Sequence, residues 1–274
     1  MVKALVIRAP GTNCDAEMCR AFAMAGAGVS LVHLDEVIAA PDIIEQHELF
    51  GFPGGFSYGD DVASGRIFAM KAREALYPHL RQAIARGGLV IGACNGFQVL
   101  VQIGLLPGPG AGDEWPEDAA PVQVASLTDN QDARFCDRWV GVKYEPGSVC
   151  VWTQGIAARL PADVGLAAAV SQLPVAHGEG RFVTSDETLA AMEKSGQIAL
   201  RYTDNYNGSM GSVAGICDAS GRVFGLMPHP ERFLDWTRHP FWTRLDAASR
   251  KGVTPGLTIF RNAVEAAKNA ATLA

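Results

Sequence analysis

Residues 92–96, Gly-Ala-Cys-Asn-Gly, place Cys94 at the spacing of a nucleophile elbow. They follow an apolar run at 89–91 and precede a helix-compatible run at 97–103. The sharp strand-to-helix turn of an elbow crowds the positions two before and two after the nucleophile, so only small residues fit there. The start of the helix favours a thiolate and offers the N–H of Asn95 to an oxyanion. A buried structural cysteine between two packing glycines is the alternative.

Residues 228–231, Pro-His-Pro-Glu, supply the base that such a nucleophile needs. In an extended segment, residues two apart lie on the same face, so His229 and Glu231 point the same way. A carboxylate beside an imidazole orients the ring and stabilises its protonated form. The pattern therefore predicts a triad of Cys94, His229 and Glu231. Four other histidines have no comparable setting and are expected to be surface or satisfied groups: His33, His47, His79 and His239.

Two adjacent glycines, Gly54 and Gly55, follow the third apolar run of the chain, at 49–52. In an open α/β sheet the loops after the strands gather at the carboxyl edge, where ligands bind, so this turn is expected near Cys94. Glycine backbone N–H groups have no side chain in the way and suit a second oxyanion donor. A purely steric role for the two glycines is the alternative.

Two further segments could contribute to a site. Residues 176–182, Ala-His-Gly-Glu-Gly-Arg-Phe, are interpreted as a loop, either a substrate or interface loop carrying His177, Glu179 and Arg181, or a solvated turn. Cys14 also lies between an apolar run and a helical run, which makes it the rival nucleophile. It lacks small neighbours at the elbow spacing and is not expected to have a His–carboxylate pair nearby.

No metal site is predicted, because the sequence contains no His-Glu-x-x-His and no Cys-x-x-Cys motif.

The elements that must position these residues alternate between strand and helix over the first hundred residues. Helices are expected at 16–25 and 74–86, each ending beside glycine, between strands at 4–8, 29–33, 49–52 and 89–92. Strands this short and this continuously apolar are usually covered on both faces. Later β-like runs indicate a more antiparallel layer, with a hairpin at 218–221; they lie at 122–127, 139–144, 149–152, 198–202, 213–217 and 223–227. The sequence thus predicts an α/β fold that is flavodoxin-like, with an open, mostly parallel sheet, helices on both faces and an antiparallel extension.

Two segments lie outside this alternation. Residues 104–121 are crowded with Gly, Pro and acidic side chains and predict an irregular surface excursion. Thr254 and Pro255 are typical of an N-cap followed by proline at the first helical position, and a helical stripe follows: Leu257, Phe260, Val264 and Ala267. We therefore expect a domain at 1–232 and a C-terminal extension at 233–274 with one helix packed on that domain.

The composition excludes several classes of protein. The 274 residues are 48% hydrophobic and 19% charged, with a formal net charge of -6, which indicates a globular chain without general attraction to nucleic acid or to an anionic membrane. The apolar run at the start is too short for a signal or membrane-spanning segment. The six cysteines are expected to be free thiols. These features favour a cytoplasmic protein.

Three motifs together resemble the triad-type (class I) glutamine amidotransferases: residues 53–60 (Pro-Gly-Gly-Phe-Ser-Tyr-Gly-Asp), 92–98 (Gly-Ala-Cys-Asn-Gly-Phe-Gln) and 228–232 (Pro-His-Pro-Glu-Arg). Asparagine after the nucleophile narrows the resemblance to the glutaminase subunits of phosphoribosylformylglycinamidine synthase, from purine biosynthesis. Residues 13–15, 138–140 and 176–181 match that pattern too, so the resemblance spans residues 3–232. The excursion and the C-terminal extension depart from the pattern and leave the partner surface undetermined.

The resemblance implies that Cys94 attacks the carboxamide carbon of glutamine, with the N–H groups of Gly55 and Asn95 holding the oxyanion. It implies that His229 gives a proton to departing ammonia and that Glu231 orients the imidazole. Water would then cleave the glutamyl thioester.

The resemblance also implies that Gln98 helps to hold glutamine or the pocket wall. Ammonia would pass to a separate synthetase subunit, which would carry ATP and Mg²⁺, and a small accessory subunit would complete the complex. No cofactor is expected in this chain. Two alternatives remain open: a stand-alone Cys-elbow amidase or γ-glutamyl hydrolase, and a non-catalytic interaction subunit of the same fold.

Overall fold

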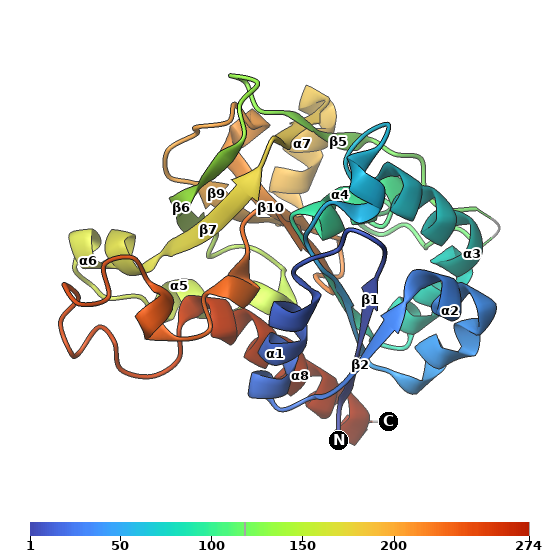
Figure 1. Cartoon of the computed structure of the whole chain (residues 1–274), viewed down its shortest axis with the longest axis horizontal. Helices are drawn as coiled ribbons and strands as arrows, with labels where there is room; N and C mark the ends of the chain where they lie inside the picture. The colour runs from blue at the N-terminus through green and yellow to red at the C-terminus, as the bar shows by residue number, and fades with distance from the viewer. Residues whose placement is uncertain (118, 274) are drawn as a thin grey trace.

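The computed structural model describes residues 1–117 and 119–273, and its centre is a nine-stranded sheet (Figure 1). In sheet order the strands are β2 (Gly28–His33), β1 (Lys3–Arg8), β3 (Leu49–Phe52), β4 (Leu89–Ala93), β11 (Val223–Leu226), β10 (Val213–Cys217), β9 (Ile198–Tyr202), β6 (Cys136–Tyr144) and β7 (Gln172–His177). The strands from β2 to β11 pair in parallel, and the pairs from β11 onward are antiparallel. The order 2-1-3-4 of the parallel half is that of a flavodoxin-like fold. The predicted fold class is therefore confirmed.

Helices cover both faces of the parallel half, because successive strand residues point to opposite sides. Ala4 and Val6 of β1 pack with α1 (Asp15–Ala25) and α8 (Pro255–Leu273), whereas Leu5 and Ile7 pack on the side of α2 (Leu34–Ala39), α3 (Arg66–Ala85) and α4 (Asn95–Ile103). Figure 1 shows α1 and α8 on one side of β1 and α2 and α3 on the other. None of the described helices is both long and apolar enough to cross a bilayer.

The antiparallel half carries the remaining elements. A separate two-stranded sheet pairs β5 (Ala125–Asp129) with β8 (Glu179–Thr184), and the short helices are α5 (Ile156–Arg159), α6 (Val164–Val170) and α7 (Asp186–Lys194). The predicted hairpin is present, since Gly221 N donates to Asp218 O at 2.9 Å between β10 and β11.

Three expected elements differ from the structure. The strand expected at 149–152 is wrong: residues Val151–Thr153 form a 3₁₀ turn in which Trp152 is buried and donates its Nε1–H to Arg222 O. The strand expected at 122–127 begins only at residue 125. The helix expected at 74–86 begins eight residues earlier, because Phe68, Ala69 and Ala72 extend its buried face.

The excursion at 104–121 contains no helix or strand among its described residues; Asp118 lies outside them. One side chain forms hydrogen bonds with both ends of this segment. The guanidinium of Arg73 in α3 donates to the carbonyls that enter and leave the excursion, at 3.0–3.2 Å: Gln102, Ile103, Ala120 and Pro121. The irregular segment is therefore a closed loop on the surface of the parallel half.

The C-terminal helix α8 begins at the residue that the sequence predicts. Thr254 Oγ1 accepts from Leu257 N at 3.2 Å and donates to Phe233 O at 2.5 Å. The predicted stripe is buried in the same core as α1. The helix thus packs on the sheet as expected, while the division into a domain at 1–232 and an extension at 233–274 stays a prediction; residue 274 lies outside the described range.

Replacing Thr254 by alanine is expected to lower the free energy of unfolding by about 1 kcal/mol, the usual cost of losing an N-cap hydroxyl. Urea unfolding at an unchanged m-value measures this loss. Thr254→Ser keeps the hydroxyl and is expected to retain most of the stability. Equal unfolding midpoints for the wild type and Thr254→Ala would show that the cap does not hold α8.

Candidate active site

Cys94 occupies a strained turn between β4 and α4. Its backbone has φ 52 and ψ -109, a combination that side-chain-bearing residues rarely adopt. A Cβ on Gly92 would lie 2.5 Å from the carbonyl oxygen of Gly96, and one on Gly96 would lie 1.8 Å from that of Phe52. Both positions therefore require glycine, because backbone carbonyl groups lie too close for a Cβ. The strand–turn–helix geometry of an elbow is present.

His229 and Glu231 form a buried pair beside this turn. His229 Nδ1 lies 2.6 Å from Glu231 Oε1, and the two residues are 2% and 1% exposed. Burial alone would lower the pKa of His229, but the charge of Glu231 and the nearby sulfurs of Cys94 and Cys14 outweigh it and raise that pKa well above its usual value. Because Glu231 occupies Nδ1, Nε2 is the ring nitrogen left for a thiol. The structure thus brings Cys94, His229 and Glu231 together.

The expectation that Cys14 has no His–carboxylate pair nearby is wrong. Its Sγ, a ring nitrogen of His229 and a carboxylate oxygen of Glu231 all lie within 4.8 Å of one another. The cause is the folding of the loop after β1 onto the loop after β3, where Cys14 N donates to Gly54 O at 3.2 Å. Spacing along the chain could not reveal this contact, because it depends on the loops after β1 and β3 meeting at the same edge of the sheet.

Cys14 is nevertheless held differently from Cys94. Arg232 Nη2 donates to Cys14 Sγ at 3.1 Å, and the thiol donates to Asn13 Oδ1 at 3.1 Å. Burial raises the pKa of Cys14, and His229 offsets that rise only in part. The spacing of Cys14, His229 and Glu231 is compatible with a metal ion, but a guanidinium against the sulfur opposes a cation, and the ring and carboxylate already bond to each other. We therefore interpret the cluster without a metal.

Cys94 lines a cavity of about 210 Å³ at the carboxyl edge of the sheet. The wall contains five of the residues selected from sequence, Gly55, Cys94, Gln98, His177 and Glu179, and six that were not selected: Phe56, Asp60, Ser64, Phe135, Ala176 and Gly178. Asp60 lies in the motif at 53–60, so the sequence alone could have identified it as a site residue. Phe135 lies in a segment without any motif, and only the fold brings it to the cavity.

The two adjacent glycines have different surroundings. The carbonyl oxygen of Gly54 accepts the N–H groups of Asn13 and Cys14, and a Cβ on Gly54 would lie 2.6 Å from His229 Cε1. Gly54 therefore makes room for the imidazole. Gly55, with φ 141, lines the cavity and forms an antiparallel bridge with Thr12. The bonds of that bridge use the residues on either side of Gly55, so its own N–H points away from the Thr12 loop.

The segment at 176–182 is not a loop. It spans the end of β7 and most of β8, with only residue 178 between the two strands. The alternation of buried residues along β7, at 173, 175 and 177, was the signal that the polar and glycine-rich composition concealed. Arg181 lies on β8, donates its Nε–H to Thr128 Oγ1 at 3.3 Å and is not among the residues that line the cavity.

His177 is buried, and its Nε2 lies 2.6 Å from the hydroxyl of Tyr206. Burial, helped by the nearby charge of His229, lowers the pKa of His177 to about 4. The ring is therefore neutral near pH 7 and does not compete with His229 as the protonated group of the site.

A buried amide network joins the elbow to the cavity wall. Asn95 Oδ1 accepts from Ser57 Oγ at 2.6 Å, and Asn95 Nδ2 donates to Asp60 Oδ1 at 3.0 Å and to Gln98 Oε1 at 3.2 Å. Gln98 Nε2 in turn donates to Glu179 O at 2.5 Å. The side chains of Asn95 and Gln98 thus fix the wall, while the backbone N–H of Asn95, at the start of α4, has no partner within the helix.

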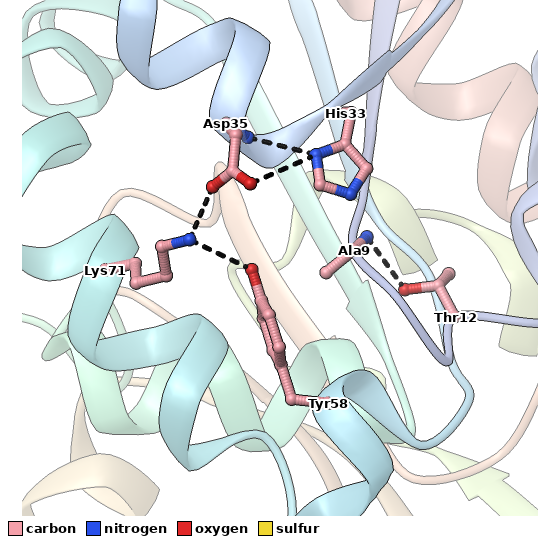
Figure 2. Close-up of polar contacts among 6 residues, drawn as sticks. All are labelled: Ala9, Thr12, His33, Asp35, Tyr58 and Lys71. Atoms are coloured by element: carbon pink, nitrogen blue, oxygen red, sulfur yellow. Dashed lines mark hydrogen bonds and ion pairs between the residues drawn. The ribbon is translucent and has the colours of Figure 1, made fainter.

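The loop after β3 is anchored on its outer side (Figure 2). Tyr58 has φ 55, and its hydroxyl accepts from Lys71 Nζ at 3.3 Å. Lys71 also donates to Asp35 Oδ1 at 2.5 Å, and the backbone N–H of Asp35 donates to His33 Nδ1 at 3.2 Å. The start of α2 and the loop after β3 are therefore tied together through Lys71 of α3, which holds the cavity wall in place.

The fold and this constellation define a glutamine amidotransferase. Residues 1–265 match the CobB/CobQ-like glutamine amidotransferase domain, and the chain belongs to that family. A glutamine amidotransferase from Thermotoga maritima, 14% identical with a TM-score of 0.50, shares the fold over 96% of each chain.

Several relatives are named as one particular subunit within this family. The chain is 42% identical to phosphoribosylformylglycinamidine synthase subunit PurQ of Dehalococcoides mccartyi, over 97% of this chain and 98% of that one. It is 38% identical to the PurQ subunit of Methanococcus maripaludis, over 96% of both chains. A chain in the structure of PurLQS from Thermotoga maritima superposes with a TM-score of 0.66 at 30% identity, over 96% of this chain and 98% of that one.

Substitution of Gly96 by alanine is expected to destabilise the protein by about 1–3 kcal/mol, the usual cost of overpacking, and to slow alkylation of Cys94 by iodoacetamide. The added Cβ must push the start of α4 away from the carbonyl of Phe52. Gly147→Ala is the matched control, because nothing lies within 4 Å of a Cβ there. Unchanged stability and unchanged Cys94 reactivity in Gly96→Ala would mean that the elbow is not constrained by this contact.

Proposed function

We propose that this chain is the glutaminase subunit of phosphoribosylformylglycinamidine synthase. It hydrolyses glutamine to glutamate and ammonia and supplies the ammonia to the complex in de novo purine biosynthesis. The observation that carries the proposal is the proximity of Cys94, strained on its elbow and open to a cavity, to the buried pair of His229 and Glu231. The names of the relatives, which align over nearly the whole chain, support it.

The first half of the reaction forms a thioester. The Cys94 thiolate attacks the carboxamide carbon of glutamine, and the carbonyl electrons move onto oxygen, where the N–H groups of Gly55 and Asn95 donate hydrogen bonds to the developing negative charge. The intermediate collapses with loss of ammonia, which takes its proton from His229 Nε2. Glu231, bonded to Nδ1, keeps the ring in the orientation and tautomer that this transfer requires.

The second half regenerates the thiol. His229, now neutral, takes a proton from a water molecule as the water attacks the glutamyl thioester. The same two N–H groups hold the second oxyanion, and glutamate leaves as the thiolate is released. Both halves use one imidazole, and a raised pKa of His229 keeps the ring protonated beside the Cys94 thiolate between turnovers.

The partners follow from the same proposal. A synthetase subunit holds ATP and Mg²⁺ and consumes the ammonia, a small accessory subunit completes the complex, and this chain itself holds no cofactor. The complex works in the cytoplasm and uses neither nucleic acid nor membrane.

Replacement of Cys94 by alanine is expected to abolish glutamine-dependent synthesis by the assembled complex and to leave ammonia-dependent synthesis intact. The two activities belong to different sites, so loss of the nucleophile affects only the first. Cys14→Ala is the control and is expected to retain glutamine hydrolysis. Hydrolysis that survives in Cys94→Ala but is lost in Cys14→Ala would assign the reaction to the other cysteine.

His229→Ala is expected to reduce glutamine hydrolysis by more than the ~10²–10⁴-fold that a positioned acid–base group usually supplies, because the nucleophile also loses its activating partner. Glu231→Gln is expected to reduce it less, since Glu231 orients the ring and transfers no proton. Steady-state glutaminase rates of the complex measure both effects. Small and equal losses in the two variants would show that the pair is structural.

A further inference from the structure

The cavity that Cys94 lines is acidic. Asp60 and Glu179 both belong to its wall, and no Lys or Arg does so in the part of the chain that the structure describes. His177 adds no positive charge near neutral pH, because burial lowers its pKa to about 4. The ring is 2% exposed, and its Nδ1 has no hydrogen-bond partner among the described residues, so the wall has bonding capacity that no protein group uses.

Asp60 is surrounded by neutral donors. Its Oδ1 accepts from Asn95 Nδ2 at 3.0 Å and from Gly65 N at 3.3 Å, and its Oδ2 accepts from Ser64 Oγ at 3.0 Å. A carboxylate offers about four acceptor positions, so these three bonds leave room for another donor. Partial burial and the nearby Glu179 raise the pKa of Asp60 despite the three bonds. The group therefore lacks the cationic partner that would stabilise its charge.

We propose that Asp60, assisted by Glu179, binds the α-ammonium group of glutamine and thereby selects a free amino acid over other primary amides. The proposal rests on the glutaminase function above and names the residues that recognise the end of the substrate away from the reacting carbon. In glutamine four bonds separate the α-nitrogen from the carboxamide carbon. Asp60 and Cys94 line the same cavity, and the side chain of Asn95, the residue after Cys94, donates to Asp60 Oδ1 at 3.0 Å, so one short substrate can reach both.

The backbone supports a fixed position for this carboxylate. Asp60 has φ 54, in the left-handed region, and its own bonds to Ser64 and Gly65 close the loop around it. Glu179 is held near Asp60, where its Oε2 accepts from Ser64 N at 3.2 Å. Ser64 thus touches both carboxylates, and the two charges lie side by side before a cation arrives. Repulsion between them is relieved when an ammonium group binds, which adds to the selectivity.

The test compares glutamine with glutaramate, the same amide without the α-amino group. In the assembled complex, the wild type is expected to hydrolyse glutamine about 10- to 100-fold more efficiently in kcat/KM, the range expected for a charged hydrogen bond. In Asp60→Asn this ratio is expected to collapse toward one, mainly through a higher KM for glutamine. Asp61→Asn, an exposed neighbour of the same type and charge, is the control and is expected to keep the wild-type ratio.

A second measurement separates recognition from loop structure. Alkylation of Cys94 by 6-diazo-5-oxo-L-norleucine, which carries the α-ammonium group, is expected to slow about 10- to 100-fold in Asp60→Asn, whereas alkylation by iodoacetamide is expected to change little. Equal slowing with both reagents would show that Asp60 only supports the elbow, and an unchanged glutamine-to-glutaramate ratio would overturn the inference. Absence of glutamine hydrolysis in the wild-type complex would instead contradict the proposed function itself.

Discussion

The bond between His229 Nδ1 and Glu231 Oε1 is the interaction on which the site depends. An imidazolium in a dry interior is strongly disfavoured unless a negative group accompanies it, and both side chains here are almost completely buried. The parts of the fold around the pair serve to keep it in place. His229 N donates to the carbonyl of Pro174 in β7, which links the parallel and antiparallel halves of the sheet at the site. Gly54 leaves the space in which the ring lies.

The same bond explains why two cysteines meet one imidazole without being equivalent. Cys14 is buried beside the pair, where Arg232 donates to its sulfur and burial favours the protonated thiol. Cys94 lies at the start of α4 and opens to the cavity, with unpartnered backbone N–H groups of the helix beside it. A nucleophile needs access to its substrate as well as a base. Only one of the two thiols has both, and the strained turn at residue 94 is what supplies the access.

The parallel half of the fold and the residues of the candidate site were predictable because each rests on local patterns. Apolar runs of four to six residues indicated the strands from β1 to β4, and the elbow placed Cys94 through its backbone geometry. The extended segment expected at 228–231 is wrong, because Pro230–Arg232 form a 3₁₀ turn, and this turn brings Glu231 to His229. Prediction failed where composition opposed the structure. The strands β7 and β8 carry proline, glycine and charged residues, and pairing with β6 and β5 overrides those preferences. The contact of Cys14 with His229 and the position of Phe135 at the cavity depend on loops that only the complete fold brings together.

The claim that Cys94 rather than Cys14 carries the covalent intermediate can be tested by acid quenching of the complex during turnover with glutamine, followed by peptide mass spectrometry. The account predicts a glutamyl group in thioester linkage on the peptide that contains Cys94, accumulating within a single turnover and disappearing when glutamine is exhausted. The peptide that contains Cys14 is expected to stay unmodified throughout. A glutamyl adduct on Cys14, or continued hydrolysis of glutamine with neither cysteine modified at any quench time, would contradict it.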